Sequence, residues 1–128
     1  MPDTILLIDD DESLLFGYKV EMELEGFCLQ AITNLFAAKE LLTTRRFNTV
    51  ITDLNLSGTE SYEGLEIIAL AKQYQSKATI IVVSGISDEN IKKKSLEVGA
   101  NAYLEKPVKA KTLLNFIRRQ VAEAGEMQ

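Results

Sequence analysis

The sequence predicts an α/β fold in which a parallel sheet is covered by helices on both faces. Short apolar runs alternate with longer segments of helical periodicity, and this βα pattern repeats five times. The apolar runs are rich in β-branched residues and lack polar alternation, as expected of strands that are buried on both faces. Several runs stop directly at acidic or hydroxyl residues, which places polar groups where strands end.

Five apolar runs are the expected strands, at residues 5–8, 28–32, 49–52, 79–83 and 102–104, with 28–32 the weakest. The single cysteine, Cys28, starts the second run and cannot form an internal disulfide. We expect it to be a small core residue, and a reducing cytoplasm to be the natural compartment.

The segments between the runs have helical spacing. Leu14, Leu15, Tyr18 and Met22 share one helix face, which Gly26 follows. Asn34 and Asp88 are suited to cap the second and fourth helices, and Gly99 to end the fourth. The remaining two apolar stripes consist of Gly64, Ile67, Ile68 and Ala71, and of Ala110, Leu113, Leu114, Ile117 and Val121.

Composition narrows the function classes. The 128 residues fit one domain, 1–128, with the last few residues a tail. A net charge of -5 argues against nonspecific nucleic-acid binding by this chain alone. No apolar run approaches the length of a membrane span, and the N-terminus lacks the basic-then-apolar pattern of a signal peptide. The absence of histidine excludes histidine-based acid–base catalysis and most zinc sites.

Open parallel sheets form their sites at the carboxyl ends of the strands. The residues that follow the expected strands are 9–11, all aspartates, then Asp53, Ser84 and Lys106. Clustered carboxylates are stable mainly beside a cation, and oxygen ligands suit Mg²⁺. A nucleophilic aspartate, a metal, a lysine and a hydroxyl donor together describe a phosphoryl-transfer site.

Four segments resemble the receiver domains of bacterial two-component signalling. They are ILLIDDD at 5–11, VITDLNL at 50–56, IVVSG at 81–85 and YLEKP at 103–107. The resemblance covers nearly the whole chain in order. It implies a flavodoxin-like (βα)5 sandwich with a five-stranded parallel sheet of order 2-1-3-4-5.

The resemblance also implies roles for individual residues. Asp53 matches the phosphoacceptor and a metal ligand, Asp10 the main ligand of Mg²⁺, and Asp9 the residue that holds a metal-bound water. Asn55 matches the position whose backbone carbonyl completes the metal site. Lys106 matches the lysine that pairs with the phosphoryl group.

The resemblance further implies a switch and its partners. Ser84 matches the switch hydroxyl, Tyr103 the aromatic that swings inward, and Pro107 the proline after a cis peptide bond. The donor would be a sensor histidine kinase or a histidine phosphotransfer protein. A downstream protein would bind a surface formed by the fourth helix, the last helix and the last strand, near the three lysines at 92–94. The family also implies a homodimer that forms through the last two helices. Such a domain catalyses only its own phosphotransfer and dephosphorylation.

The sequence departs from the family in the loop after the acceptor. Ser57 stands where the family usually has a proline, and the loop 57–63 is longer than usual. We hypothesise that Glu60 or Tyr62 in this loop modulates access to Asp53. Apolar Ile86, two residues after Ser84, is expected to hinder the water that hydrolyses the phosphoryl group.

Other interpretations are weighed against this one. The acidic run 9–12 could be a helix start, and Asp53 or the Ser84–Gly85 pair an ordinary turn. A magnesium-dependent aspartyl-phosphate phosphatase would carry a second aspartate at position 55, where this chain has Asn55. The turn after the first expected strand lacks the Ser/Thr/Gly-rich phosphate loop of flavodoxins, which argues against a flavodoxin-like cofactor domain. A phosphorylation-silent receiver-like interaction module is the main alternative.

Overall fold

The computed structural model describes residues 3–56 and 62–126, with side chains described up to residue 120. Its elements in order are β1 (Thr4–Ile8), α1 (Glu12–Leu24), β2 (Cys28–Ile32), α2 (Leu35–Thr44), β3 (Thr49–Thr52), α3 (Glu63–Tyr74), β4 (Thr79–Ser84), α4 (Glu89–Val98), β5 (Ala102–Glu105) and α5 (Ala110–Glu126). The strands form one parallel sheet of order β2-β1-β3-β4-β5. This is the flavodoxin-like order that the resemblance implies.

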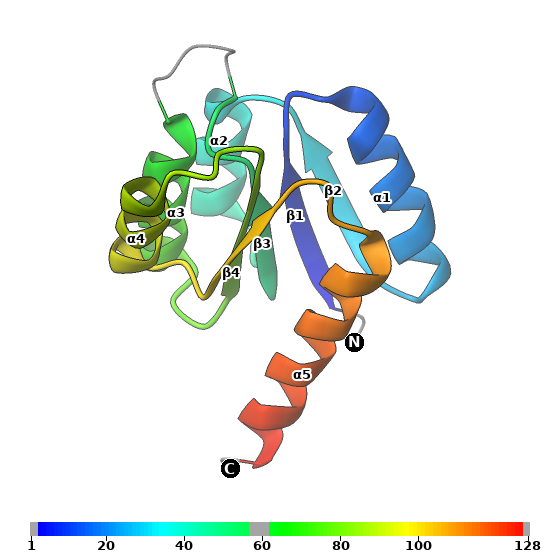
Figure 1. Cartoon of the computed structure of the whole chain (residues 1–128). Coiled ribbons are helices and arrows are strands. Elements are labelled where there is room, and N and C mark those ends of the chain that lie inside the picture. The colour runs from blue at the N-terminus through cyan, green and yellow to red at the C-terminus, as the bar shows by residue number, and fades with distance from the viewer. Residues whose placement is uncertain (1–2, 57–61, 127–128) are drawn as a thin grey trace.

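The sheet separates two hydrophobic cores. Helices α1 and α5 cover one face, and α2, α3 and α4 cover the other (Figure 1). Because successive side chains of a strand point to opposite faces, Ile5 and Leu7 of β1 join the first core, while Leu6 and Ile8 join the second. Burial on both faces explains why the central strands are continuously apolar.

Helices and strands begin close to the residues that the sequence patterns predict. The run 49–52 coincides with β3, whereas β1 begins one residue before the expected strand, at Thr4. Asn34 accepts a hydrogen bond from the backbone N–H of Ala37 at 2.8 Å, and Asp88 caps α4 in the same manner. None of the described helices is both long and apolar enough to cross a membrane.

The expectation that Cys28 is a core residue is wrong, because its side chain is exposed. Cys28 is the first residue of β2, which pairs only with β1 and therefore forms an edge of the sheet. Gln30, two residues further along, is exposed as well. An apolar neighbourhood in the sequence does not reveal that a strand lies at an edge.

A buried side chain that the sequence analysis did not single out secures the connection into β3. The Gln75 side chain accepts from the backbone N–H of Phe47 at 3.0 Å and donates to the carbonyls of Leu42 at 2.8 Å and Arg45 at 2.5 Å. These bonds satisfy backbone groups of the turn between α2 and β3. Gln75 therefore helps to fix the strand that leads to Asp53.

Candidate functional site

The ends of β1 and β3 bring two aspartates to the same edge of the sheet. The backbone N–H of Asp53 donates to the carbonyl of Ile8 at 3.0 Å, and that of Asp9 donates to Ile32 at 3.2 Å. The strand ladders therefore continue one residue beyond each strand. Asp9 is 4% exposed and Asp53 is 7% exposed, so both carboxylates are largely withdrawn from water.

Three carboxylates converge at this edge. Ligand oxygens of Asp9, Asp10 and Asp53 all lie within 4.8 Å of one another, with Asp10 the exposed member. Asp11 has a separate task, because its side chain caps α1 by accepting from the N–H of Leu14 at 3.1 Å. The capping interpretation of the acidic run thus applies to Asp11, while Asp9 and Asp10 contribute to the cluster.

Lys106 reaches the cluster from the loop after β5. Its backbone N–H donates to the carbonyl of Ser84 at 2.9 Å, which anchors the residue beside the end of β4. Its Nζ donates to Asp9 Oδ2 at 2.7 Å and to Asp53 Oδ2 at 2.9 Å. The peptide bond to Pro107 is cis, as the resemblance implies.

The electrostatics of the cluster follow from burial and charge. Burial raises the pKa of the Asp9 carboxyl, and the hydrogen bond from Lys106 offsets this only in part. For Lys106, burial favours the neutral amine, but the two carboxylates outweigh it and raise the pKa of the ammonium group. The pKa of Asp9 stays raised despite its ion pair with Lys106, because the effect of burial on Asp9 outweighs that pair.

Asn55 lies beside Asp53. Its backbone N–H donates to Asp53 Oδ1 at 3.3 Å, and its side-chain Oδ1 is buried with no hydrogen-bond partner among the described residues. The role of its backbone carbonyl as a metal ligand stays a prediction.

Ser84 and Tyr103 meet at the backbone of one residue. Ser84 Oγ accepts from the N–H of Ile86 at 3.2 Å, and Tyr103 Oη donates to the carbonyl of Ile86 at 2.6 Å. Tyr103 is buried, and burial raises the pKa of its phenol. Among the described residues, Ser84 Oγ has no hydrogen bond to Asp53, so the switch roles of both residues stay predictions.

Gly64 is a site residue that the sequence analysis noted only as part of a helix face. Its N–H donates to the carbonyl of Leu54 at 2.8 Å, which holds the first turn of α3 against the segment that follows β3. A Cβ atom at this position would lie 2.3 Å from the Asp53 carbonyl oxygen and 2.5 Å from Leu54 Cα. Only glycine permits this approach. A glycine in the first turn of the helix that follows Asp53 is the signal that could have revealed it.

Most of the long loop after Asp53, including Ser57 and Glu60, lies outside the described residues. Tyr62 is described, and it has left-handed backbone angles (φ 50°, ψ 49°) immediately before α3. This conformation is uncommon for a residue other than glycine. The hypothesis that Tyr62 modulates access to Asp53 stays untested.

The residues present fit a hard divalent cation. Counted by formal charge, the three carboxylates and the ammonium group of Lys106 leave an excess of two negative charges in a partly buried pocket. All three carboxylates offer oxygen ligands, the donor type that Mg²⁺ and Ca²⁺ prefer. A doubly charged ion would balance the pocket.

The flavodoxin-like fold and this acidic pocket define an α/β module whose site lies at the carboxyl edge of a parallel sheet. A family model described as the response regulator receiver domain matches residues 5–118. The chain therefore belongs to the response regulator receiver domain family, and its acidic pocket fits phosphorylation on an aspartate.

Curated relatives are longer proteins. The photosynthetic apparatus regulatory protein RegA of Rhodobacter capsulatus is 29% identical over 114 residues, which are 89% of this chain and 60% of that protein. The phosphoglycerate transport system transcriptional regulatory protein PgtA of Salmonella typhimurium is 30% identical over 89% of this chain and 27% of that protein. The chain spans 24% to 60% of the length of such relatives.

Solved structures show the same fold. A CheY-like receiver domain protein from Methanospirillum hungatei is 26% identical, with a TM-score of 0.90 and full coverage of both chains. A response regulator from Burkholderia pseudomallei is 27% identical, with a TM-score of 0.81, over 97% of this chain and 74% of that one. That crystal structure contains a phosphorylated aspartic acid, a calcium ion and citrate.

Proposed function

We propose that this chain accepts a phosphoryl group on Asp53 from a phosphohistidine of a sensor kinase or phosphotransfer protein. The observation that carries the proposal is the position of Lys106 Nζ, within 2.9 Å of both Asp9 and Asp53, in a pocket with two excess negative charges. Transfer to a carboxylate requires positioning and charge neutralisation rather than an acid–base residue. The absence of histidine is therefore compatible with this chemistry.

The residues divide the work of transfer. A carboxylate oxygen of Asp53 attacks phosphorus and forms an O–P bond, while the P–N bond to the donor imidazole breaks and the imidazole nitrogen takes up a proton. Lys106 stays protonated and neutralises charge on the phosphoryl oxygens. Asp9, Asp10 and Asn55 would hold Mg²⁺, which supplies charge stabilisation to the transferring group when bound.

The backbone of Ile86 would link phosphorylation of Asp53 to a change in the surface of the domain. In the proposal, Ser84 Oγ turns from the N–H of Ile86 to a phosphoryl oxygen, which shifts the backbone that Tyr103 holds at 2.6 Å. Phosphorylation thereby biases an equilibrium between two arrangements of one surface. The domain would act only on its own phosphoryl group and would not turn over an external substrate.

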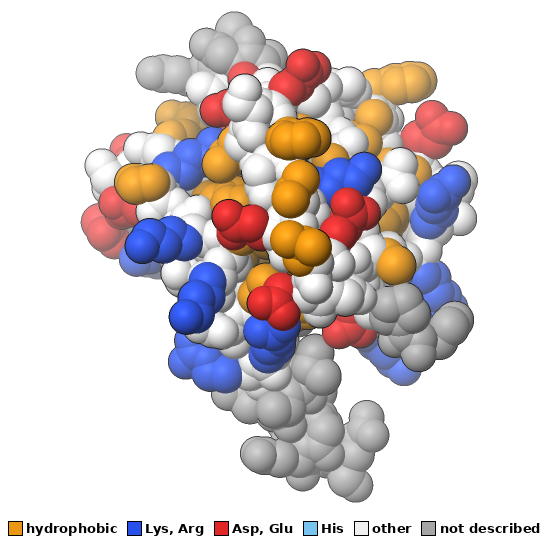
Figure 2. Space-filling view, turned by 90° about the vertical axis from the view of Figure 1, so that its right-hand side faces the viewer, with side chains coloured by type: hydrophobic (Ala, Val, Ile, Leu, Met, Phe, Trp, Pro, Cys, Tyr) orange, Lys and Arg blue, Asp and Glu red, His pale blue; other side chains and the backbone are white. Residues whose placement is uncertain are grey.

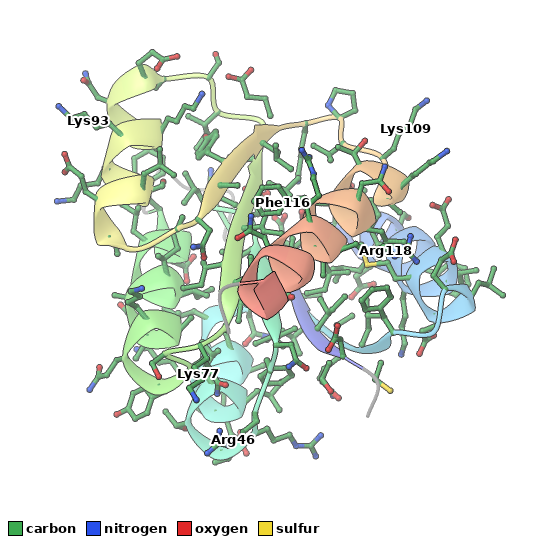
Figure 3. The ribbon with its side chains drawn as sticks, turned by 90° about the horizontal axis from the view of Figure 1, so that it is seen from below. Arg46, Lys77, Lys93, Lys109, Phe116 and Arg118 are labelled. Atoms are coloured by element: carbon green, nitrogen blue, oxygen red, sulfur yellow. The ribbon has the colours of Figure 1, made fainter. Side chains whose placement is uncertain are left out.

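A downstream protein would read the surface formed by α4, β5 and α5. In the view of Figure 3, Lys93 on α4 and Lys109 before α5 project away from the body on opposite sides of β5. Of the expected lysine run, Lys93 and Lys94 are exposed and Lys92 is half-buried. This run would meet acidic groups of the partner.

The proposal is tested with phosphoramidate, a small donor that contains the same P–N bond. The chain is incubated with Mg²⁺ and its intact mass is measured, beside samples with EDTA and with Asp53→Asn. Asp88→Asn is the matched control, because Asp88 is an exposed helix cap outside the pocket. One added phosphoryl group, lost with EDTA and in Asp53→Asn but kept in Asp88→Asn, supports the proposal. No addition to the wild type would favour the phosphorylation-silent module.

A further inference from the structure

The side chain of Tyr18 connects α1 to the loop that carries Lys106. Tyr18 is only 7% exposed, and its ring packs in the core between the sheet and the helices α1 and α5. Its hydroxyl donates a hydrogen bond to the backbone carbonyl of Val108, which lies 90 residues further along the chain. Among the described residues, this carbonyl accepts no other hydrogen bond. The Tyr18 hydroxyl is thus the group that satisfies it.

The loop that Tyr18 reaches is short and is held at two points. It consists of residues 106–109, between β5 and α5. At its start, the backbone N–H of Lys106 donates to the carbonyl of Ser84 at 2.9 Å, which fixes the loop to the end of β4. Two residues later, Tyr18 holds the carbonyl of Val108, whose side chain also packs against the same core. The backbone that carries the Lys106 side chain therefore has one anchor on the sheet and one on α1.

The contacts around Tyr18 form a closed ring with the acidic pocket. Asp9 Oδ1 accepts from the backbone N–H of Asp11 at 2.9 Å, and the Asp11 side chain caps α1. Roughly two turns into that helix, Tyr18 bonds Val108. Two residues before Val108, Lys106 returns to Asp9 Oδ2 at 2.7 Å. The two oxygens of the Asp9 carboxylate are therefore held by groups whose positions both depend on α1.

Tyr18 belongs to the inner side of α1 and not to its outer surface. The outer surface faces the viewer in Figure 2 and carries hydrophobic, acidic and basic side chains, whereas Tyr18 is one of the buried residues of the helix. In Figure 3 the start of α5, marked by Lys109, lies beside α1, where the hydrogen bond to Val108 is made. Burial raises the pKa of the Tyr18 phenol, so the hydroxyl stays protonated and remains a donor at neutral pH.

We infer that Tyr18 is a positioning residue for Lys106, because its hydroxyl holds the loop after β5 where the ammonium group lies between Asp9 and Asp53. Lysine carries its charge on a flexible four-carbon stem, so the place of the charge depends on how firmly its backbone is held. Lys106 Nζ lies 2.7 Å from Asp9 Oδ2 and 2.9 Å from Asp53 Oδ2, and a displaced loop would lengthen at least one of these bonds. The inference rests on the proposed function for its effect on phosphoryl transfer, whereas the place of Lys106 is measurable without any transfer.

The competing explanation is that Tyr18 only fills the core between α1 and α5. Tyr18→Phe separates the two explanations, because it keeps the ring and removes the donor to the Val108 carbonyl. Met22→Ala is the matched packing control, since Met22 is fully buried on the same side of α1 and in the same core. It leaves a cavity but leaves the Tyr18 hydroxyl in place. Tyr74→Phe is the control for loss of a hydroxyl, since Tyr74 is 50% exposed on α3.

The first measurement reads the place of Lys106 from its own ammonium group. The isotope-labelled full chain is studied by NMR in EDTA, and the side-chain signal of Lys106 is assigned by its loss in Lys106→Met. Bonds to two carboxylates should shift this signal away from those of exposed lysines and slow the exchange of its protons with water. We expect Tyr18→Phe to move the signal toward those of exposed lysines and to speed the exchange. Met22→Ala and Tyr74→Phe should leave it where it is in the wild type.

The second measurement is the initial rate at which acetyl phosphate and Mg²⁺ label the chain. A hydrogen bond between neutral groups is worth a factor of roughly three to ten, so we expect Tyr18→Phe to slow labelling by about that factor. Met22→Ala should have a lower Tm than Tyr18→Phe and yet label at the rate of the wild type. Tyr74→Phe should match the wild type in both Tm and labelling rate.

Three results would overturn the inference. An unchanged Lys106 signal in Tyr18→Phe would show that the hydroxyl does not position the lysine. An equal movement of that signal in Met22→Ala would assign the effect to core packing. A moved signal with a wild-type labelling rate would show that the position set by Tyr18 does not matter for transfer. If the wild type itself takes no label, the proposed function fails, and the NMR comparison alone then decides whether Tyr18 positions Lys106.

Discussion

Replacement of Gly64 by alanine is the sharpest perturbation of the site, because it adds one methyl group against the backbone of Asp53 and Leu54. The added Cβ would lie 2.3 Å from the Asp53 carbonyl oxygen, 2.5 Å from Leu54 Cα and 3.0 Å from Asp53 C. These neighbours are backbone atoms, which cannot rotate away as a flexible side chain can. Either α3 or the acceptor segment must move.

The size of the expected destabilisation follows from the overlap between the added Cβ atom and the backbone atoms of Asp53 and Leu54. Ordinary carbon–oxygen and carbon–carbon contacts lie above about 3.4 Å, so the two backbones must separate by roughly 1 Å. Overpacking of this kind costs about 1–3 kcal/mol, and the backbone contact places Gly64→Ala near the upper end. A displacement of about 1 Å at a reacting group can slow a reaction about a hundredfold. We therefore expect a large fall in the rate at which Asp53 accepts a phosphoryl group.

The assay combines urea unfolding, followed by circular dichroism, with the initial rate of labelling by acetyl phosphate and Mg²⁺. Gly17→Ala is the matched control, since Gly17 is exposed on α1 and a Cβ there would have no neighbour within 4 Å. Because alanine favours a helix over glycine by up to about 1 kcal/mol, Gly17→Ala should be slightly more stable and label normally. If Gly64→Ala were as stable as the wild type, the close approach of α3 to the backbone of Asp53 and Leu54 would be refuted. If it lost stability but was labelled at the normal rate, the link between this approach and the reactivity of Asp53 would be refuted.

Three further predictions concern the buried polar groups. Lys106→Met should lower the free energy of unfolding by about 2–3 kcal/mol in urea titrations, less than for a fully buried pair because the lysine side chain is 25% exposed; an unchanged value would contradict the ion pairing. Since the pKa of Asp9 is raised from 3.8, the folded chain binds this proton more tightly than the unfolded chain. The stability of the metal-free protein should therefore fall as the pH rises from about 3.8 through the raised pKa of Asp9, and the fall should be smaller in the Asp9→Asn variant. The measurement is Tm against pH in EDTA, and identical profiles for the wild type and Asp9→Asn would refute this prediction. Gln75→Leu should cost about 2–4 kcal/mol because three backbone groups lose their partner, whereas Gln73→Leu on the exposed side of α3 should be neutral by the same urea assay.

The elements with strong local signals were predictable from the sequence. The β-branched run 49–52 coincides with β3, and Asn34 and Asp88 cap their helices as expected. The convergence of Asp9, Asp53 and Lys106 was also predictable, because parallel strands end at one edge of a sheet. The order of the strands came from the family resemblance, since periodicity does not specify which strands are neighbours.

The features that the sequence did not reveal depend on contacts between distant segments. Cys28 has apolar neighbours in the chain, yet it is exposed because β2 is an edge strand. Gly64 has the spacing of a helix-face residue, and only the approach of α3 to Leu54 shows why a side chain is excluded there. Gln75 reads as an ordinary polar residue at a helix end until the turn into β3 is seen to need its hydrogen bonds.

The identity of the phosphoryl acceptor is the central claim, and chemical mapping tests it most directly. The chain is phosphorylated with acetyl phosphate and Mg²⁺ and reduced with borohydride, which converts an aspartyl phosphate to homoserine, and the digest is then sequenced by mass spectrometry. Three carboxylates lie within 4.8 Å of one another, so the position of the modification is informative. Homoserine at position 53 alone is the predicted result. Homoserine at position 9 or 10, or at none of the three, would contradict the assignment of Asp53.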